Sequence, residues 1–353
     1  MRRTGWGAAL LLLAGAAQAQ HVAIEAQDSG TNVRLRGISA VDANTAWASG
    51  REGTVLRTTD GGKTWGAVSV PDAKALDFRD IEAFDANAAV VLSIGPGAVS
   101  RVYRTDDAGK TWTLTLQNKD ERAFFDCMVF DGQRGWMLGD PVDGHYQVHT
   151  TQDGGRHWTL QTTGPDAKTD EAAFAASGTC IARTPWGETL AVSGGADARA
   201  HLGDSGGKLW FAHATPMAHR IPAAGIFSAT AMGEDMLLVG GDFEHDATGS
   251  AARVRFVPGH GMKVEAMPAP RGYRSGAGCV ASTTAPTCIA VGPNGVDAWN
   301  GTQWSAVSDT GYDAVDLAGD AGWASGDQGR IARIVISSSK PPQVSSSKPK
   351  QAP

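Results

Sequence analysis

Short segments in which hydrophobic and polar residues alternate recur along the chain, with turn-forming residues between them. Residues 35–41, 78–84 and 124–130 each begin with Leu or Phe and then alternate. A period of two residues is typical of a β-strand with one buried face. A second kind of segment is short, mostly apolar and ends at Gly, as at 45–50 and 288–292. Beyond residue 20 no amphipathic stretch reaches the length of an ordinary helix, so the pattern predicts an all-β fold.

A turn motif with the pattern T-x-D-x-G-x-T-W divides these segments into repeating units. It occurs at 58–65, 105–112 and 151–158, with His157 in place of the second Thr in the last copy. Its Trp residues are 47 and 46 residues apart, and a more divergent copy follows at 203–210. Asp accepts hydrogen bonds from its own turn, Gly adopts a positive φ, and Trp buries a large ring against a neighbouring unit. We therefore interpret the motif as structural, a role that falls to Asp60, Trp65, Asp107, Trp112, Asp153 and Trp158.

Units of about 40–50 residues that each contain four short strands are typical of a β-propeller. The sequence divides into seven such blades, at 33–70, 77–118, 123–163, 173–214, 225–268, 272–309 and 311–336. The seventh blade has room for only three strands. Residues 21–27 form a strand that belongs to no blade, and we expect it to complete the seventh blade as its outer strand and close the ring. The predicted domain covers residues 20–336.

The two ends of the chain differ in composition from the rest. Residues 1–19 combine Arg2 and Arg3 with an apolar stretch and a small-x-small cleavage site, which is the pattern of a secretory signal peptide. Residues 337–353 are rich in Ser, Pro and Lys and are expected to form a disordered tail. The sequence therefore predicts an exported protein, either periplasmic or secreted. No later stretch is apolar for long enough to be a transmembrane segment.

Composition and charge narrow the class of partner. The chain has 31 Lys and Arg residues against 37 Asp and Glu residues, a net charge of −6. Without the five basic residues of the predicted signal peptide and tail, 26 basic residues remain against 37 acidic ones, so the body carries about −11. A nucleic-acid-binding protein ordinarily carries a basic excess, and we expect no nucleic-acid partner here.

Four cysteines, an even number in a protein predicted to be exported, suggest disulfide bonds. Cys279 and Cys288 flank a turn between adjacent strands of the sixth blade, and we expect them to be bonded to each other. Cys127 and Cys180 lie at matching points of the inner strands of blades three and four, where the sequence is compatible either with a disulfide or with two buried thiols. There is no C-x-x-C motif and no cluster of His and Cys, so neither a metal site nor a cofactor is predicted.

The order of strands in a blade locates a candidate binding mouth. The start of the first strand and the end of the second lie on one face of the ring, and the Asp-containing turns lie on the other. The second residue of the first strand is charged in four consecutive blades, which predicts an arc of charge at the first face. The arc consists of Arg274, Asp313, Arg36 and Arg79, and the nearby acidic candidates are Asp80, Asp126, Asp140 and Asp242.

Clustered arginines on an acidic body are suited to bidentate contacts with a carboxylate or a phosphate. The same arginines can instead pair with neighbouring Asp residues and tie the blades together. The sequence leaves both interpretations open. They differ in what an Arg-to-Ala substitution removes, which is binding in the first case and stability in the second.

The repeated turns and the blade count resemble the Asp-box repeats of bacterial neuraminidases. More closely, residues 25–336 resemble the photosystem II stability and assembly-factor propellers. The residues that carry this resemblance are the T-x-D-x-G-x-T-W turns together with 139–144, 225–228, 240–243, 272–275 and 291–295. The resemblance implies a monomeric, non-catalytic, seven-bladed propeller that binds a protein or polymer partner in the cell envelope. It is an analogy for function, because a fold does not fix an activity.

A carbohydrate-active hydrolase is the alternative, because sialidases also carry Asp-box repeats. Sialidase chemistry needs three arginines on the substrate carboxylate, a Tyr nucleophile with an acidic partner, and an acid/base Asp. The segment 220–222 resembles the arginine motif of that family, but it follows three Asp boxes instead of preceding them. The chain has four Tyr residues, of which Tyr273 and Tyr312 begin inner strands and are expected in the core. We therefore favour binding over catalysis and name no catalytic residue.

Overall fold

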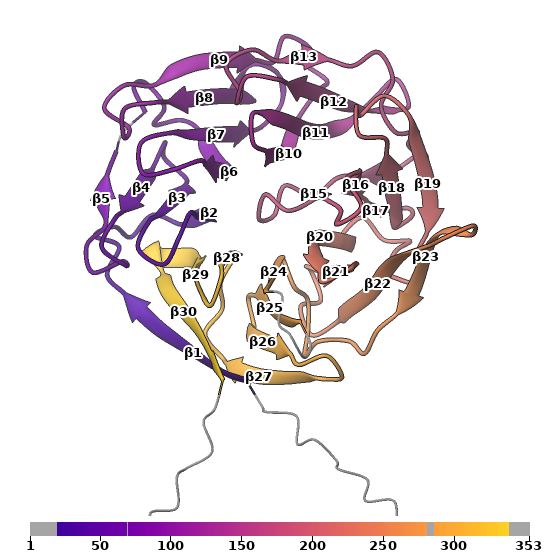
Figure 1. Cartoon of the computed structure of the whole chain (residues 1–353). Coiled ribbons are helices and arrows are strands. Elements are labelled where there is room, and N and C mark those ends of the chain that lie inside the picture. The colour runs from indigo at the N-terminus through magenta and orange to yellow at the C-terminus, as the bar shows by residue number, and fades with distance from the viewer. Residues whose placement is uncertain (1–19, 69, 281–285, 339–353) are drawn as a thin grey trace, which may run out of the picture.

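The computed structural model describes residues 20–338, except residues 69 and 281–285. Seven β-sheets stand around a central channel, and each runs from an inner strand at the channel to an outer strand at the rim (Figure 1). The expected all-β, seven-bladed propeller is confirmed. Among the described residues the helical elements are two short 3₁₀ turns, Gly97–Val99 and Asp327–Gly329. No helix in this part of the chain is long and apolar enough to cross a membrane.

The first four blades follow one another along the chain. Blade 1 contains β2 (Leu35–Ala40), β3 (Ala46–Gly50), β4 (Val55–Thr58) and β5 (Gly66–Ala67). Blade 2 contains β6 (Asp77–Ala83), β7 (Ala89–Ile94), β8 (Arg101–Thr105) and β9 (Thr113–Gln117). Blade 3 contains β10 (Phe125–Asp131), β11 (Arg134–Val142), β12 (His145–Thr151) and β13 (Thr159–Leu160). Blade 4 contains β15 (Ile181–Arg183), β16 (Thr189–Val192), β18 (Arg199–Gly203) and β19 (Trp210–Ala214).

The remaining blades complete the ring. Blade 5 contains β20 (Ala224–Met232), β21 (Asp235–Asp242), β22 (Gly249–Val257) and β23 (Gly261–Ala266), and two short strands, β14 (Glu171–Ala172) and β17 (Gly194–Gly195), extend its sheet. Blade 6 contains β24 (Gly276–Val280), β25 (Thr287–Gly292), β26 (Gly295–Trp299) and β27 (Trp304–Ser308). Blade 7 contains β28 (Ala314–Ala318), β29 (Ala321–Ser325), β30 (Ile331–Ser338) and β1 (Gln20–Gln27).

The first and last strands of the chain share one sheet. β1 pairs antiparallel with β30 along its whole length, from Gln20 opposite Ser338 to Gln27 opposite Ile331. β30 therefore extends two residues past the predicted domain boundary at 336, because β1 offers it a ladder partner there. The predicted signal peptide, 1–19, and the predicted tail from residue 339 onward lie outside the described residues.

The Asp-containing turns have the hydrogen bonds that the motif predicts. In blade 1 the Thr58 hydroxyl donates to the Asp60 carboxylate at 2.9 Å. This carboxylate also accepts hydrogen bonds from the backbone N–H and the hydroxyl of Thr64, at 3.0 and 2.7 Å. The N–H of Gly62, whose φ is 80°, donates to the Thr58 hydroxyl. These contacts stabilise the ionised carboxylate and lower the pKa of Asp60 to about 2. The turns of blades 2 and 3 repeat the arrangement.

Tryptophan residues join neighbouring blades. Trp112 of the blade 2 turn packs edge-on against Trp47 of β3 in blade 1, with ring centroids 6.4 Å apart. Trp65 of the blade 1 turn packs in the same way on Trp323 of β29 in blade 7, at 6.5 Å. The side-chain oxygen of Gln27 in β1 accepts hydrogen bonds from the ring N–H groups of both Trp65 and Trp323. The Trp–Trp contact between blades 7 and 1, where the ring closes, thus repeats the Trp–Trp contact between blades 1 and 2. At the closure, β1 supplies the hydrogen-bond acceptor for both indole N–H groups.

The described residues contain two disulfide bonds, one within blade 6 and one between blades 3 and 4. Cys279 and Cys288 lie directly opposite each other on β24 and β25 and are bonded, as expected. Cys127 of β10 is bonded to Cys180, the residue before β15, which decides between the two alternatives that the sequence left open. This second bond joins blade 3 to blade 4, and both of its cysteines are fully buried.

Thr105→Val is expected to lower the free energy of unfolding by about 1–3 kcal/mol, because the buried N–H of Gly109 then loses its hydroxyl acceptor. Valine keeps the branched shape of threonine and its preference for strands. Urea unfolding followed by Trp fluorescence measures the change. Thr113→Val, at an exposed position of β9, is the matched control. Equal stability of the two variants would show that the Thr105 hydroxyl does not stabilise the turn.

Candidate functional site

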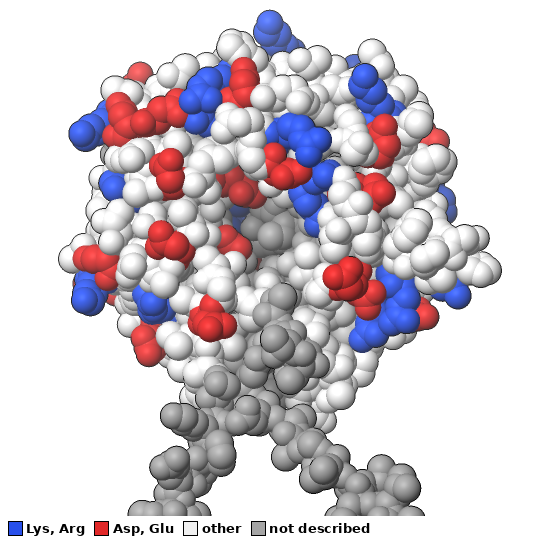
Figure 2. Space-filling view, viewed as in Figure 1, with Lys and Arg blue, Asp and Glu red and all other residues white. Residues whose placement is uncertain are grey.

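The central channel holds two cavities, one toward each end. Arg36 of β2 and Arg79 of β6 line the first, of about 490 Å³, which we call the mouth cavity. Ile38 and Ile81, two residues further along the same strands, line the second, of about 270 Å³, which we call the far cavity. β2 and β6 thus begin at the mouth cavity and run toward the far cavity. The space-filling view shows the ring hollowed at its centre, with charged side chains of both signs around it (Figure 2).

One position in the inner strands brings a residue to the mouth cavity in five of the blades. In β2 and β6 a β-bulge leaves Arg36 and Arg79 outside the ladder, and both line this cavity. A bulge in β20 places Phe227 there in the same way. A bulge re-aims a side chain that regular alternation would direct elsewhere. Ahead of β24 and β28 the equivalent residues are Ser275 and Asp313, which also line the mouth cavity.

Three guanidinium groups meet at the mouth cavity, and they are unequally paired. Arg34 donates to both carboxylate oxygens of Asp313, at 2.6 and 2.9 Å. Arg79 donates at 2.6 Å to the backbone carbonyl of Ala175 and at 3.2 Å to the carboxylate of Asp77. Arg36 lies between them, with its Nε 3.6 Å from the Asp313 carboxylate. That Nε is buried and has no hydrogen-bond partner among the described residues.

An aromatic cluster forms the opposite wall of the mouth cavity. Phe174 and Phe227 are stacked, with centroids 4.0 Å apart and planes at 5°. Tyr273 meets Phe227 edge-on at 4.7 Å, and Phe243 meets it edge-on at 6.1 Å. Phe243 keeps 49% of its surface exposed, which is unusual for a large apolar side chain in a packed cluster. The cavity therefore offers a positively charged wall and an apolar wall to the same ligand.

The charge of the mouth cavity opposes the charge of the whole molecule. Three arginines line it against Asp246 and Asp313, whereas the body of the protein is strongly acidic. Burial, together with the neighbouring Arg79 guanidinium, lowers the pKa of Arg36 to about 10. The Arg36 side chain thus remains cationic at neutral pH in surroundings that disfavour its charge. An anion bound beside it would remove this penalty.

The expectation that Arg274 joins the arc is wrong. Its side chain is fully buried and forms an ion pair with Asp297 of β26, which also accepts a hydrogen bond from Arg271 at 2.7 Å. The sequence 272–276 can be aligned with the other inner strands in two ways. In the structure Ser275, and not Arg274, occupies the position equivalent to Arg36 and lines the mouth cavity. A shift of one residue sends a side chain to the other face of a strand, which explains the error.

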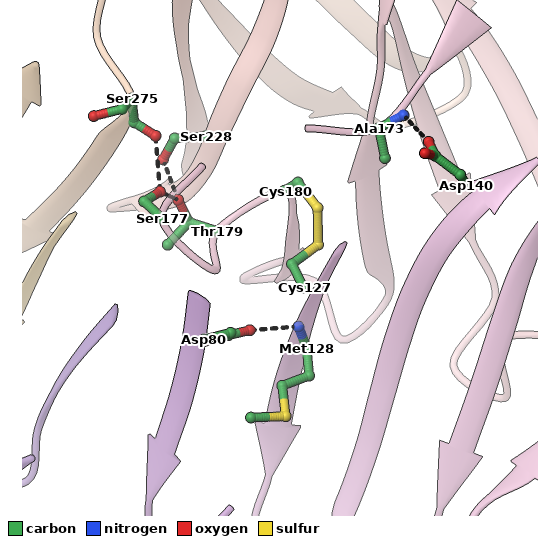
Figure 3. The surroundings of a disulfide bond; sticks show 10 residues. All are labelled: Asp80, Cys127, Met128, Asp140, Ala173, Ser177, Thr179, Cys180, Ser228 and Ser275. Atoms are coloured by element: carbon green, nitrogen blue, oxygen red, sulfur yellow. Dashed lines mark hydrogen bonds between the residues drawn. A yellow bond between two sulfur atoms is a disulfide. The ribbon is translucent and has the colours of Figure 1, made fainter. Parts of the chain in front are cut away.

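The four acidic candidates do not gather at the mouth cavity. Asp80 accepts the backbone N–H of Met128 in blade 3 and lines the far cavity (Figure 3). Asp140 accepts a backbone N–H from the segment that follows blade 3 (Figure 3). Asp242 accepts N–H groups of its own turn. Asp126 stands at the bulge of β10, where burial and the nearby Asp140 raise its pKa well above the usual range. Asp80 and Asp140 thus connect neighbouring segments, whereas Asp242 stabilises its own turn.

The far cavity carries acidic side chains instead. Asp80, Glu82 and Asp316 line it, and no basic side chain does so among the described residues. Burial raises the pKa of Asp80 and of Glu82, and each is raised further by the neighbouring carboxylates. Burial also raises the pKa of Asp316, to about 6. At neutral pH the raised pKa values keep Asp80 and Glu82 largely protonated, so the far cavity carries much less negative charge than its three acidic residues suggest.

Sequence reasoning missed part of the mouth cavity. Arg34 precedes the first strand of blade 1, and its pairing with Asp313 appears only when blades 1 and 7 are brought together. Phe227 occupies the position equivalent to Arg36, so alignment of the inner strands could have found it. Phe174 lies in the irregular segment before β15, where no repeat pattern gives a register.

The fold and the cavity together define a class of protein, an Asp-box propeller with a ligand-sized cavity at one end of its channel. A family model described as the photosynthesis system II assembly factor YCF48 matches residues 13–120, about a third of the chain. This match confirms the resemblance to the photosystem II assembly-factor propellers. No curated protein matches the sequence.

Solved structures of the same architecture cover most of the chain. YCF48 bound to a D1 peptide is 17% identical, with a TM-score of 0.60, and the alignment covers 88% of this chain and 96% of that one. YCF48 from Cyanidioschyzon merolae is 18% identical, with a TM-score of 0.60 and coverage of 88% and 98%. Virginiamycin B lyase from Staphylococcus aureus is 11% identical, with a TM-score of 0.59 and coverage of 90% and 99%. At these identities the likeness establishes the fold alone.

Arg274→Met is expected to destabilise the protein by about 3 kcal/mol, because it leaves the buried carboxylate of Asp297 with Arg271 as its remaining cation. Urea unfolding measures the loss. Arg134→Met, at an exposed position of β11, is the control and should change stability by less than about 0.5 kcal/mol. Equal stability of the two variants would show that Arg274 does not hold blade 6 together.

Asp80→Asn is expected to stabilise the protein increasingly as the pH rises from about 5 to 8. The pKa of Asp80 is raised by folding, so the folded state holds a proton that the unfolded state releases, and stability falls with rising pH. Asparagine keeps the acceptor for the Met128 N–H and does not titrate. The difference in unfolding free energy between variant and wild type should grow by at most about 1.4 kcal/mol per pH unit. A constant difference over that pH range would contradict the raised pKa.

Proposed function

We propose that the protein is a non-catalytic propeller that binds a segment of a protein partner in its mouth cavity. The segment presents a carboxylate to the arginines and an aromatic or large apolar side chain to the aromatic wall. The buried Nε of Arg36 carries this proposal, because it has no hydrogen-bond partner among the described residues and lies 3.6 Å from the Asp313 carboxylate, too far for a hydrogen bond. A buried polar atom without a partner is costly unless a ligand satisfies it, and guanidinium groups bind carboxylates in a bidentate geometry.

The relative charges of the cavity and the body support an anionic ligand. A protein with about −11 on its body repels acidic segments over most of its surface. The mouth cavity is an exception, because Arg34, Arg36 and Arg79 exceed the two aspartates that line it. Binding would therefore be directed to this one place, and would weaken as salt is added.

The comparison with YCF48 supports a peptide as the ligand class. A solved structure of that protein holds a D1 peptide, and its fold matches this chain over nearly its whole length. We extend peptide binding to this chain as part of the proposal, with the partner identified by its chemistry, an acidic segment with an aromatic or apolar neighbour.

We also propose that the protein works outside the cytoplasm. Both of its disulfides join fully or mostly buried cysteines, and such bonds persist in oxidising compartments. The predicted signal peptide at 1–19 points the same way. The cell envelope or the exterior is then the place where the partner is met.

Hydrolysis is the competing function, since three arginines and Tyr273 line one cavity, as in the sialidase arrangement. Two observations favour binding. Burial raises the pKa of Tyr273 well above its usual value, whereas a nucleophile needs a lowered one. Arg34 is engaged by both oxygens of Asp313, so it is not free for a substrate carboxylate. Turnover of a fluorogenic glycoside that is lost on Asp313→Asn would favour the hydrolase instead.

Binding can be tested with an array of ten-residue peptides that vary in acidic and aromatic content. Wild-type protein should retain peptides that carry both a carboxylate and an aromatic side chain, and Glu-to-Gln versions of these peptides should bind at least tenfold more weakly. The double variant Arg36→Ala/Arg79→Ala should lose at least tenfold in affinity, because the charge-assisted bonds to the carboxylate are gone.

Arg134→Ala is the matched control, since it removes one exposed guanidinium far from the mouth cavity. It should leave affinity within twofold of wild type. Urea unfolding of all variants separates binding from stability. If the Arg36 and Arg79 double variant binds as well as wild type but unfolds more easily, the arginines only tie blades together and the proposal fails.

A further inference from the structure

Blade 4 begins differently from the other blades. Its inner strand, β15, has three residues, whereas β6 and β10 have seven each. The residues that would extend β15 toward the mouth, 174–180, form a loop that reaches into the middle of the ring (Figure 1). We call residues 174–179 the plug.

The plug contacts the walls of the channel on several sides. Ala175 and Ala176 accept hydrogen bonds from Arg79 in blade 2 and Arg36 in blade 1. Phe174 stacks on the aromatic wall of blade 5. On the far side, the Ser177 hydroxyl donates at 2.7 Å to the carbonyl of Ser275 in blade 6, and the Thr179 hydroxyl bonds to Ser228 in blade 5 (Figure 3).

The plug also separates the two cavities. Residues 174–176 line the mouth cavity and residues 177–179 line the far cavity. Gly178 lies so close to Asp80 that a Cβ on it would come within 2.2 Å of the Asp80 carboxylate, and its φ is 81°. The mouth cavity thus has a floor, and this floor carries one aromatic wall residue and the carbonyls that orient two of its arginines.

A single covalent bond ties this floor to a neighbouring blade. Cys180, directly after the plug, is bonded to Cys127 of β10, and the pair is fully buried beside the channel (Figure 3). Apart from this bond the plug is held by non-covalent contacts, which are the hydrogen bonds and the aromatic stack given above and a hydrogen bond from the Ala229 N–H to the Thr179 carbonyl. Its middle consists of the small residues Ala175 and Ala176. A chain of small residues outside a ladder has many alternative conformations, so a covalent anchor at its end restricts it strongly.

We propose that Cys127 and Cys180 are positioning residues for the mouth cavity. Their disulfide fixes the plug, and the plug in turn holds Arg36, Arg79 and Phe174 in the geometry that receives the ligand. This inference rests on the proposed function for its binding readout. Its structural part, that the disulfide orders the plug, stands without any ligand.

The test compares two disulfide deletions in the mature chain. Cys127→Ala/Cys180→Ala should bind the tightest peptide of the array at least tenfold more weakly than wild type. Cys279→Ala/Cys288→Ala, which removes the other disulfide, should bind within twofold. Hydrogen exchange read by mass spectrometry should become at least tenfold faster in residues 174–180 of the first variant and stay unchanged there in the second. Unchanged exchange, or faster exchange with unchanged affinity, would overturn the proposal.

A second pair of variants displaces the plug while both disulfides remain. Gly178→Ala introduces a Cβ that clashes with Asp80, whereas Gly187→Ala imposes a similar positive φ on alanine with no atom within 4 Å. Only Gly178→Ala should weaken peptide binding tenfold. If the cysteine variant does not fold, this pair of glycine variants shows whether the position of the plug controls binding, and equal binding by the two would overturn the proposal. If wild type binds no peptide at all, the proposed function fails, and exchange in residues 174–180 alone decides whether the disulfide orders the plug.

Discussion

The pairing of β1 with β30 is the constraint on which the rest of the structure depends. It joins the two ends of the described chain in one sheet, so seven blades close into a ring and their inner strands face a common channel. Gln27 strengthens the closure, because its side-chain oxygen accepts hydrogen bonds from the indole N–H groups of Trp65 in blade 1 and Trp323 in blade 7. Without closure, Asp313 of blade 7 would not meet Arg34 of blade 1, and the mouth cavity would lack one side.

Departures from the regular blade make the site. Three bulges aim Arg36, Arg79 and Phe227 into the channel, and a shortened inner strand in blade 4 leaves residues 174–179 free to cross it. Many side chains of the regular strands are buried in the hydrophobic core between blades. Binding residues on irregular segments held by a rigid scaffold are common in proteins.

The sequence was sufficient for the fold because the fold is periodic. The Asp-containing turns give the blade register, and the unpaired strand at 21–27 indicates how the ring closes. The site was predictable where the inner strand kept the pattern, as at Arg36, Arg79 and Asp313. It was not predictable at Arg274, where glycines on both sides allow two registers. It was also not predictable in the plug, because contacts between blades far apart in sequence decide its course.

The plug has an electrostatic consequence for the whole ring. It separates a cavity lined by arginines from one lined by carboxyls that burial keeps largely protonated, so the two ends of the channel differ electrically. An acidic chain that approaches in solution is attracted by the guanidinium groups at one end and meets no basic side chain among the described lining residues at the other. The ring therefore has two unlike ends, one with permanent positive charge and one whose carboxyls become charged only as the pH rises.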